Sequence, residues 1–300
     1  MGIPTTMTAV LAHSSAADSL VASERPVPTP AADEVLLVVS AAAITSGELD
    51  WPDAHPFVPA HDVSGTVVSV GADVTEFRIS DAVIGLVAFD RDGALSEYAT
   101  VKSADLAAAP RTIDSVRAAS LPLGGLTAWQ ALVDHAALAS GQHVLVHGGA
   151  GGVGAYGVQV AAHLGARVTA TARADDAKLV TSYGADAVID YTTAFEEQVA
   201  DVDVVFDTVG GDVVARSWPV LRPGGILVSI FDEVAAPSDG VRGEYFVVEP
   251  SGPQLAELAR LVDAGALRPV VGRIVPFADA TTAFLTEKNG HHPGKTVVEF

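Results

Sequence analysis

The chain has 300 residues, of which 49% are hydrophobic, and this length is sufficient for two domains with buried cores. Its 17 basic and 37 acidic residues give a net charge of −20, which repels nucleic-acid phosphates and anionic lipids, so we expect neither nucleic-acid nor membrane partners. The sequence contains no cysteine, which excludes disulfides and thiolate metal ligands and fits a cytoplasmic location. No basic residue precedes Arg25, so we expect no secretory signal.

The first part of the chain, residues 8–110, is composed of short β-rich runs separated by Pro, Gly, Asp and Ser. Such runs predict strands, and their succession predicts a β-rich barrel or sandwich. The expected strands are 35–39, 65–70, 82–88 and 95–101.

After Leu121 the pattern changes to strand, glycine turn and helix in alternation, which predicts an α/β domain with a doubly wound parallel sheet. The last segment returns to strand-like character and is expected to rejoin the β-rich domain. We therefore predict domains at 1–121 and 122–264, with 265–300 returning to the first. The expected strands are 143–147, 167–171, 187–190, 203–207 and 225–230, and the expected helices are 154–164, 174–183, 213–221 and 254–264.

A glycine-rich motif, G-x-G-x-x-G, follows the first predicted strand of the second domain and opens its first helix. A match alone is weak in a chain with 28 glycines, but a strand before it and a helix after it are the context of a dinucleotide site. Glycines there permit a tight turn and the approach of backbone amides to a pyrophosphate, which the helix N-terminus stabilises. The alternative is a purely structural turn. The predicted cofactor-binding residues are Gly149, Ala150, Gly151, Gly152, Val153 and Gly154.

Arg173 favours NADP over NAD. It follows the second predicted strand at the position where NAD sites usually carry an acidic residue, and a guanidinium there can bind a 2′-phosphate. Asp175 and Asp176 follow directly and lower the local potential. The alternative is a solvated loop arginine without a ligand.

Several motifs resemble the zinc-independent quinone oxidoreductase (zeta-crystallin-like) family of the medium-chain dehydrogenase/reductase superfamily. They are spread over nearly the whole chain, and the segment 121–132 is the most specific of them. The matching segments are 59–65 (PAHDVSG), 96–99 (SEYA), 121–132 (LPLGGLTAWQAL), 184–191 (GADAVIDY), 207–211 (DTVGG), 221–225 (LRPGG) and 294–297 (GKTV).

This resemblance implies a GroES-like catalytic domain, a Rossmann domain, and a nicotinamide site between them. Tyr191 matches a tyrosine that holds the adenosine phosphate in relatives, whereas the lysine that assists it there is Asp176 here. A homodimer is implied by analogy only. Positions that line the cofactor in relatives, with ordinary packing as the alternative, are Thr127, Thr208, Val209, Phe231 and Phe246.

The sequence predicts no metal site. His61-Asp62 resembles the histidine motif of the zinc alcohol dehydrogenases, but their zinc site also uses cysteines, which this chain lacks. His61 is therefore expected to line the site or to be hydrogen-bonded.

A site without a metal is poorly equipped to polarise a simple alcohol, whereas a quinone or an α,β-unsaturated carbonyl delocalises the charge that hydride addition creates. The resemblance thus implies an NADPH-dependent reductase of such compounds. Thr45 stands where relatives carry an asparagine, and Thr45 and Thr127 are the candidate catalytic residues. A backbone-bonded hydroxyl is the alternative for Thr45. Two other functions stay open: a tailoring enoyl or keto reductase of a biosynthetic pathway, and an NADPH-binding protein with little turnover.

Overall fold

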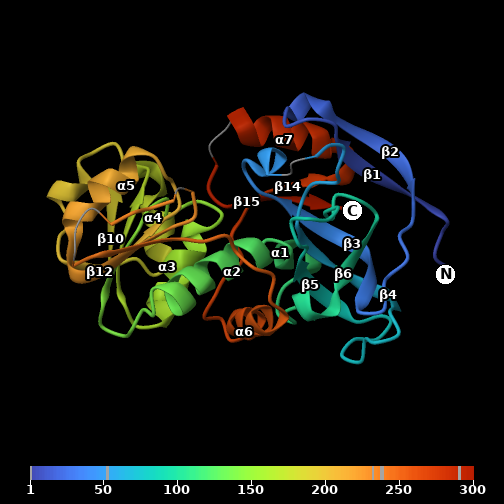
Figure 1. Cartoon of the computed structure of the whole chain (residues 1–300), viewed down its shortest axis with the longest axis horizontal. Helices are drawn as coiled ribbons and strands as arrows, with labels where there is room; N and C mark the ends of the chain where they lie inside the picture. Colours follow the sequence, from blue (N-terminus) through green and yellow to red (C-terminus); the bar gives the residue numbers. More distant parts are fainter. Residues whose placement is uncertain (1, 52–53, 232, 237–239, 290–291) are drawn as a thin grey trace. The chain divides into compact units, whose positions relative to one another are not determined.

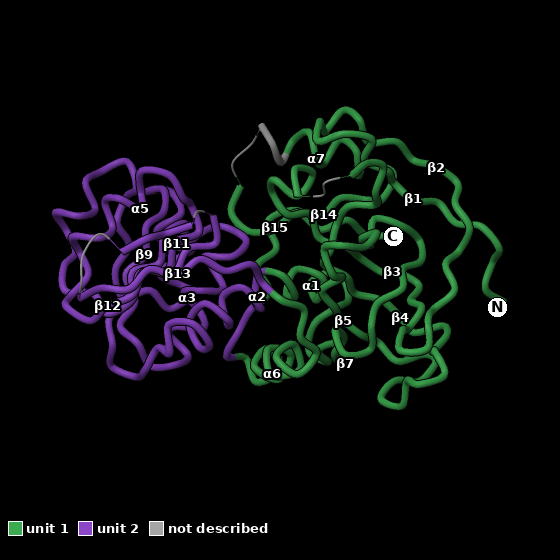
Figure 2. The backbone as a smooth tube through the Cα atoms, viewed as in Figure 1, with its two compact units in different colours: residues 1–123, 249–265, 269–300 green, residues 124–248, 266–268 purple. Residues whose placement is uncertain are grey.

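The structure is a computed structural model that describes residues 2–51, 54–231, 233–236, 240–289 and 292–300. The chain forms two compact units (Figures 1 and 2). Unit 1 contains residues 1–123, 249–265 and 269–300, and unit 2 contains residues 124–248 and 266–268. No helix among the described residues is both long and apolar enough to cross a membrane.

Unit 1 is β-rich, as the sequence predicts. Its larger sheet has the order β14-β15-β3-β4-β5-β7, with β6 also paired to β3, while β1 and β2 form an antiparallel hairpin. The long strand β3 is apolar and almost wholly buried, so it lies in the unit's main core. The strands are β1 (Thr6–Ala12), β2 (Leu20–Pro26), β3 (Glu34–Ile44), β4 (Asp62–Val70), β5 (Ala82–Leu86), β6 (Tyr98–Lys102), β7 (Leu106–Ala108), β14 (Val271–Pro276) and β15 (Lys295–Glu299).

Unit 2 contains the doubly wound parallel sheet that the sequence predicts. Its order, β10-β9-β8-β11-β12-β13, reverses direction between β8 and β11, and ligands bind such sheets at the carboxyl ends of the strands where the order reverses. The strand β13 was not predicted. The elements are α2 (Pro122–Trp129, its first two residues in unit 1), a π-helical turn (Gln130–His135), β8 (His143–Val146), α3 (Gly154–His163), β9 (Arg167–Ala172), α4 (Ala177–Ser182), β10 (Ala187–Asp190), β11 (Val202–Asp207), α5 (Asp212–Ser217), β12 (Leu221–Ser229) and β13 (Arg242–Tyr245).

The division into units differs from the predicted domains at residues 122–123, 249–264 and 266–268, and helix α6 is the largest difference. Helix α6 (Gly252–Asp263) was predicted to belong to 122–264, whereas it packs with unit 1. A Cβ atom on Gly252 would lie 2.4 Å from the Leu106 carbonyl oxygen, and Asp263 accepts hydrogen bonds from the amides of Arg111 and Thr112. The alternating strand-helix pattern does not carry this information, because the helix's partners lie about 150 residues earlier in the chain.

A second difference is helix α7 (Ala280–Asn289), which lies inside the segment that was expected to be strand-like. The strands β14 and β15 flank it, so the expectation is correct only for the two ends of that segment. The remaining helix of unit 1 is α1 (Ser115–Ala118). Single 3-10 turns lie at Ala17–Ser19, Glu48–Asp50, Ser103–Asp105, Ala174–Asp176, Phe195–Glu197, Trp218–Val220 and Phe277–Asp279.

Candidate active site

The glycine-rich turn connects β8 to α3 at the carboxyl end of the parallel sheet. The Gly149 amide donates to the Thr171 carbonyl at 2.9 Å, which ties the turn to the neighbouring strand β9. The Gly151 amide donates to the Gly148 carbonyl at 2.8 Å and closes the turn on itself. Helix α3 begins at Gly154, so no carbonyl group of the same helix accepts a hydrogen bond from the amides of Val153 and Gly154.

Close approaches of the backbone explain why this turn requires glycine. A Cβ atom on Gly154 would lie 2.2 Å from the Gly148 carbonyl oxygen, and one on Gly149 would lie 2.9 Å from the Ala170 Cβ. Gly148 has φ +71, a conformation that disfavours other residues. Gly151 is less crowded, because its Cβ would approach only the Gly148 oxygen, at 3.2 Å.

The turn therefore fits a dinucleotide pyrophosphate. Ala150 is buried, whereas Gly151, Gly152 and Val153 are partly exposed, and the two glycines present backbone without a side chain. A helix N-terminus with bare amides stabilises phosphate through hydrogen bonds and the helix dipole.

Arg173 and Tyr191 lie beside each other at the end of the sheet. Arg173 directly follows β9 and Tyr191 directly follows β10, and the Tyr191 amide donates to the Ala172 carbonyl at 3.0 Å. Both side chains are exposed, Tyr191 at 50% of its surface. Within the described part of the chain, the Arg173 guanidinium makes no ion pair. A cation and a phenol are therefore available to a ligand at this edge.

Thr208 and Val209, which follow β11, adjoin the glycine turn. The Thr208 hydroxyl donates to the His147 carbonyl at 2.7 Å, and a Cβ atom on Gly148 would approach both Thr208 and Val209. The Val209 side chain is 47% exposed.

The two phenylalanines predicted to line the cofactor differ from each other. Phe231 is 59% exposed near the end of β12, whereas Phe246 is buried with its ring centroid 4.3 Å from that of His135. The Phe231 ring is thus accessible and the Phe246 ring is packed, and the role of each toward the cofactor stays a prediction. Thr127 is buried in α2, in unit 2, whereas Thr45 lies in unit 1.

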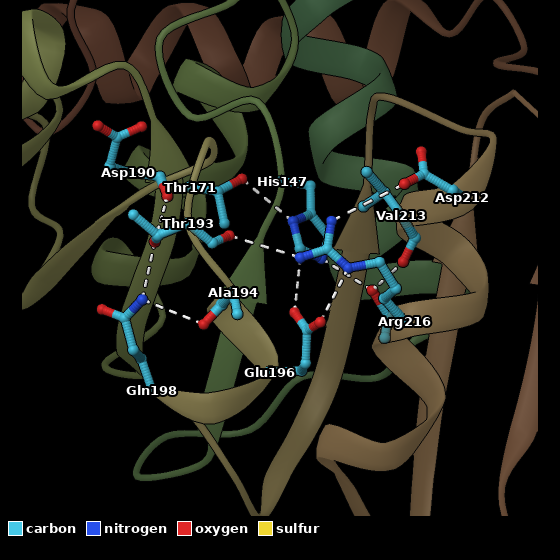
Figure 3. A network of polar contacts seen from close by, with 11 residues as sticks. His147, Thr171, Asp190, Thr193, Ala194, Glu196, Gln198, Asp212, Val213 and Arg216 are labelled. Atoms are coloured by element: carbon cyan, nitrogen blue, oxygen red, sulfur yellow. Dashed lines mark hydrogen bonds and ion pairs between the residues drawn. The ribbon is translucent and has the colours of Figure 1, made fainter.

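His147, immediately before the glycine turn, is buried in a polar network (Figure 3). The Ser217 hydroxyl donates to the Val213 carbonyl at 2.7 Å, so it accepts from His147 Nε2 at 2.9 Å. The Thr171 hydroxyl accepts from the Gly148 amide at 3.3 Å and donates to His147 Nδ1 at 3.1 Å. These partners fix a neutral imidazole that links the turn to α5 and β9.

Burial lowers the pKa of His147 to about 3, and the nearby Arg216 cation acts in the same direction. Arg216 is held by Glu196 at 2.7 Å (Figure 3). Its guanidinium also lies 4.7 Å from the centroid of the Phe195 ring, which packs edge-on against His147. In the unfolded chain this imidazole takes up a proton near pH 6.5, whereas in the folded chain it stays neutral.

We expect His147 to make folding sensitive to acid. A lowered histidine pKa contributes stability that is present above pH 6.5 and is lost as the pH falls toward 3. The stability advantage of the parent over His147→Gln should therefore shrink by about 1.4 kcal/mol per pH unit below pH 6. Urea unfolding between pH 4.5 and 7.5 measures this difference. The same substitution at the exposed His163 is the control, and an advantage of the parent that is independent of pH would contradict the prediction.

A second buried polar cluster lies in unit 1 and contains Thr45. The strand register pairs Ala43 with Asp62 and Ile44 with Thr296, which brings the ends of β3, β4 and β15 together. Lys295 Nζ donates to Thr45 Oγ1 at 2.9 Å and to Asp62 Oδ2. Asp62 and Lys295 are 0% and 3% exposed, so this ion pair is enclosed by protein.

Glu48 completes this cluster from the 3-10 turn that follows Thr45. Its carboxyl oxygens accept hydrogen bonds from the amides of Thr45 and Ala60, each at 3.2 Å. Burial raises the pKa of Glu48 to about 8, against the opposing influence of the Lys295 cation. Burial also raises the pKa of Asp62, against the same cation and the hydrogen bond from the Leu123 amide.

A cluster of three rings, Trp51, Phe89 and His61, adjoins the buried polar cluster of unit 1. The rings of Trp51 and Phe89 are 5.1 Å apart, and Phe89 lies 5.1 Å from His61. His61 is buried with Nδ1 3.0 Å from the Val87 carbonyl oxygen, and burial lowers its pKa to about 4. The Trp51 side chain is 42% exposed. The described residues contain no group of three or more His, Cys, Asp or Glu arranged to hold a metal ion.

Four residues of these sites were not predicted from the sequence: Lys295, Glu48, Asp62 and His147. A signal for the charged residues was present, because Asp62 and Lys295 stand at the starts of apolar β-rich runs, where a charge needs a partner. Their pairing over more than 230 residues follows only from the strand register. His147 carried the same kind of signal, a polar residue at the end of an apolar strand.

Two protein-family models match parts of this chain. The model of the alcohol dehydrogenase GroES-like domain matches residues 31–111, and the model of a zinc-binding dehydrogenase matches residues 183–298. The chain is 34% identical over 281 residues to the mitochondrial NAD(P)H oxidoreductase RTN4IP1 of Mus musculus, a match that covers 82% of this chain and 71% of that protein. It is 36% identical over 291 residues to the chloroplastic NADPH-dependent alkenal/one oxidoreductase of Arabidopsis thaliana, covering 91% and 73%.

The fold has a solved counterpart in the quinone oxidoreductase from Coxiella burnetii, with a TM-score of 0.91 and 29% identity over 98% of this chain and 99% of that one. Fold and glycine turn together define an oxidoreductase of the medium-chain dehydrogenase/reductase superfamily that uses a nicotinamide cofactor. Within it, the chain belongs to the quinone oxidoreductase, or zeta-crystallin-like, family. Its independence of zinc stays a prediction.

Proposed function

We propose that this enzyme uses NADPH to reduce α,β-unsaturated carbonyl compounds or quinones, without a metal. The observation that carries the choice of cofactor is the exposed pair Arg173 and Tyr191, at the end of the sheet where the ribose 2′-position of a dinucleotide is expected. The Arg173 guanidinium makes no ion pair in the described chain and can donate two hydrogen bonds to one phosphate group. The name of the Arabidopsis thaliana relative supports the same cofactor and the alkenal or alkenone class of substrate.

We assign cofactor binding to the residues around the glycine turn of unit 2, and substrate binding to Thr45 and Trp51 of unit 1. The turn 149–154 holds the pyrophosphate, while Thr208, Val209 and Phe231 present a hydroxyl and apolar surface at the neighbouring strand ends. The bound cofactor supplies the hydride. Thr45 supplies a hydroxyl to the substrate oxygen, and the partly exposed Trp51 offers a flat apolar face to a conjugated substrate. The roles of Thr127 and Phe246 are restricted to shaping the cofactor pocket from buried positions.

Arg173 is expected to set the preference between cofactors. The substitution Arg173→Ala should weaken NADPH binding by about tenfold to 100-fold, because a charged hydrogen bond to phosphate contributes about 1.5–3 kcal/mol, and should leave NADH binding within about twofold. Dissociation constants from cofactor fluorescence measure both. Arg167→Ala, at the opposite end of the same strand, is the matched control. Equal affinity of the parent for NADPH and NADH would overturn the assignment.

We further propose a cytoplasmic homodimer. Two apolar side chains are exposed on and just after the edge strand β13: Tyr245, at 40% of its surface, and Val247, at 57%. We expect a second copy of the chain to cover them. The absence of cysteine supports a reducing compartment. Light scattering after size-exclusion chromatography tests the dimer, and we expect the variant Val247→Asp to be monomeric. Cell fractionation tests the cytoplasmic location.

A further inference from the structure

We propose that Lys295 is a positioning residue, which holds the Thr45 hydroxyl so that it donates a hydrogen bond to the substrate oxygen on which negative charge forms. This inference rests on the proposed function, because it assigns a further residue to the same reaction. It adds to the site a lysine that lies 250 residues from Thr45 in the sequence.

The direction of the hydrogen bond between Lys295 and Thr45 determines where the Thr45 hydroxyl proton points. An ammonium group only donates, so Thr45 Oγ1 must accept from Lys295 Nζ at 2.9 Å. The hydroxyl proton of Thr45 is then directed away from the lysine and toward another acceptor. Among the residues that the structure describes, none accepts from this hydroxyl. Thr45 is partly exposed, so a ligand oxygen can take that place.

The surroundings hold the lysine in one position. Its ammonium is buried and also donates to Asp62, whose other oxygen accepts from the Leu123 amide at 2.5 Å. Glu48 fixes the backbone of Thr45 by accepting from its amide. The charged or titratable groups that face Lys295 are thus Asp62 from β4 and Glu48 from the 3-10 turn.

Stability alone does not require this arrangement. Burial of an ion pair costs desolvation that its mutual attraction only partly offsets, and well-packed apolar residues of similar volume often stabilise a protein as much or more. A dry ammonium next to a ligand-accessible hydroxyl is, by contrast, well suited to stabilise developing negative charge, since electrostatic interactions are strong where water is excluded.

With an α,β-unsaturated ketone as substrate, a hydride adds with its electron pair to the β-carbon. The π electrons of the alkene then form a bond between the α-carbon and the carbonyl carbon, and the carbonyl π pair moves to oxygen. The resulting enolate oxygen accepts the Thr45 hydrogen bond. A proton from water then adds to the α-carbon and restores the carbonyl group. Lys295 does not lose its proton in this scheme; it polarises the hydroxyl that the substrate contacts.

The first test uses kinetics of purified full-length variants with NADPH and an enone. Thr45→Val should lower kcat by about 100-fold with KM changed less than threefold, whereas Thr45→Ser should retain parent-like kcat. Lys295→Met should lower kcat to a similar extent, and the double variant should be no worse than either single one, since the lysine acts through the hydroxyl. Lys102→Met, an exposed lysine of the same unit, is the control. Parent-like kcat in Thr45→Val, or effects that multiply in the double variant, would overturn the proposal.

The second test needs no turnover and is independent of the first. A substituted phenol that absorbs differently as phenolate mimics the enolate oxygen, and it is titrated onto the parent chain without cofactor. The parent should favour bound phenolate, with an apparent phenol pKa lowered by at least one unit, and Thr45→Val should abolish that shift while it leaves the Lys295 ion pair in place. An unshifted phenol pKa in the parent would contradict the role of Thr45 and Lys295. A shifted phenol together with no reduction of any enone or quinone would instead contradict only the proposed reaction.

Discussion

Gly154→Ala is expected to weaken NADPH binding by about 100-fold and to destabilise unit 2. The new Cβ would lie 2.2 Å from the Gly148 carbonyl oxygen and 2.7 Å from its carbon, so the turn must move. The displaced amides would lose one or two charged hydrogen bonds to the pyrophosphate, each worth about 1.5–3 kcal/mol. The strain itself should cost about 1–3 kcal/mol of folding free energy. Fluorescence titration with NADPH and urea unfolding measure the two effects.

Gly151→Ala is the matched control for this prediction. It introduces the same methyl group three residues earlier, where the Gly148 oxygen would be 3.2 Å away and only a small adjustment is needed. We expect a loss of NADPH affinity of less than about tenfold. Equal effects of the two substitutions would show that crowding at the start of α3 does not decide the shape of the turn.

Asp62→Asn is expected to destabilise unit 1 by about 3–5 kcal/mol, because it removes the carboxylate that pairs with the buried Lys295 ammonium. Glu48, whose pKa burial raises to about 8, replaces that charge only in part at pH 7. The carboxamide keeps the size of the side chain, so packing is largely unchanged. The double variant Asp62→Asn with Lys295→Met should recover most of the loss, since the uncompensated charge is then absent. Urea unfolding of the parent and of each variant at pH 7 gives the free energies.

Asp114→Asn is a suitable reference for Asp62→Asn, because Asp114 and Arg117 form an exposed pair in the same unit. Exposed ion pairs contribute about 0–1 kcal/mol. A loss below about 1 kcal/mol for Asp62→Asn would mean that water reaches Lys295 and would weaken its assignment as a dry cation.

Much of the fold follows from the sequence because it depends on local patterns. Short apolar runs that alternate with helices predicted the parallel sheet, and the turn 149–154 lies at its carboxyl edge as the motif requires. Helix α6 shows the limit of such patterns, since its partners near Leu106 and Arg111 are remote in the sequence. The same limit applied to the cluster around Thr45, because no spacing rule connects residue 295 to residues 45 and 62.

For Arg173 and Tyr191, the structure adds position and exposure to what the motifs predict. The sequence placed both near the ribose end of a cofactor, and the structure finds them adjacent and exposed at neighbouring strand ends. For Phe231 and Phe246, which the sequence treated alike, burial separates an exposed surface ring from a packed one. Their roles toward the cofactor stay predictions.

The most direct test of the proposed function is to follow a labelled hydride from the cofactor into the product. The purified protein would be incubated with NADPH deuterated at the transferable position of C4 and with a panel of enones and quinones, and the products analysed by mass spectrometry and NMR. For an enone, we predict one deuterium on the former β-carbon, with the α-hydrogen derived from water. NADPH that binds but transfers no deuterium to any member of the panel would contradict the account.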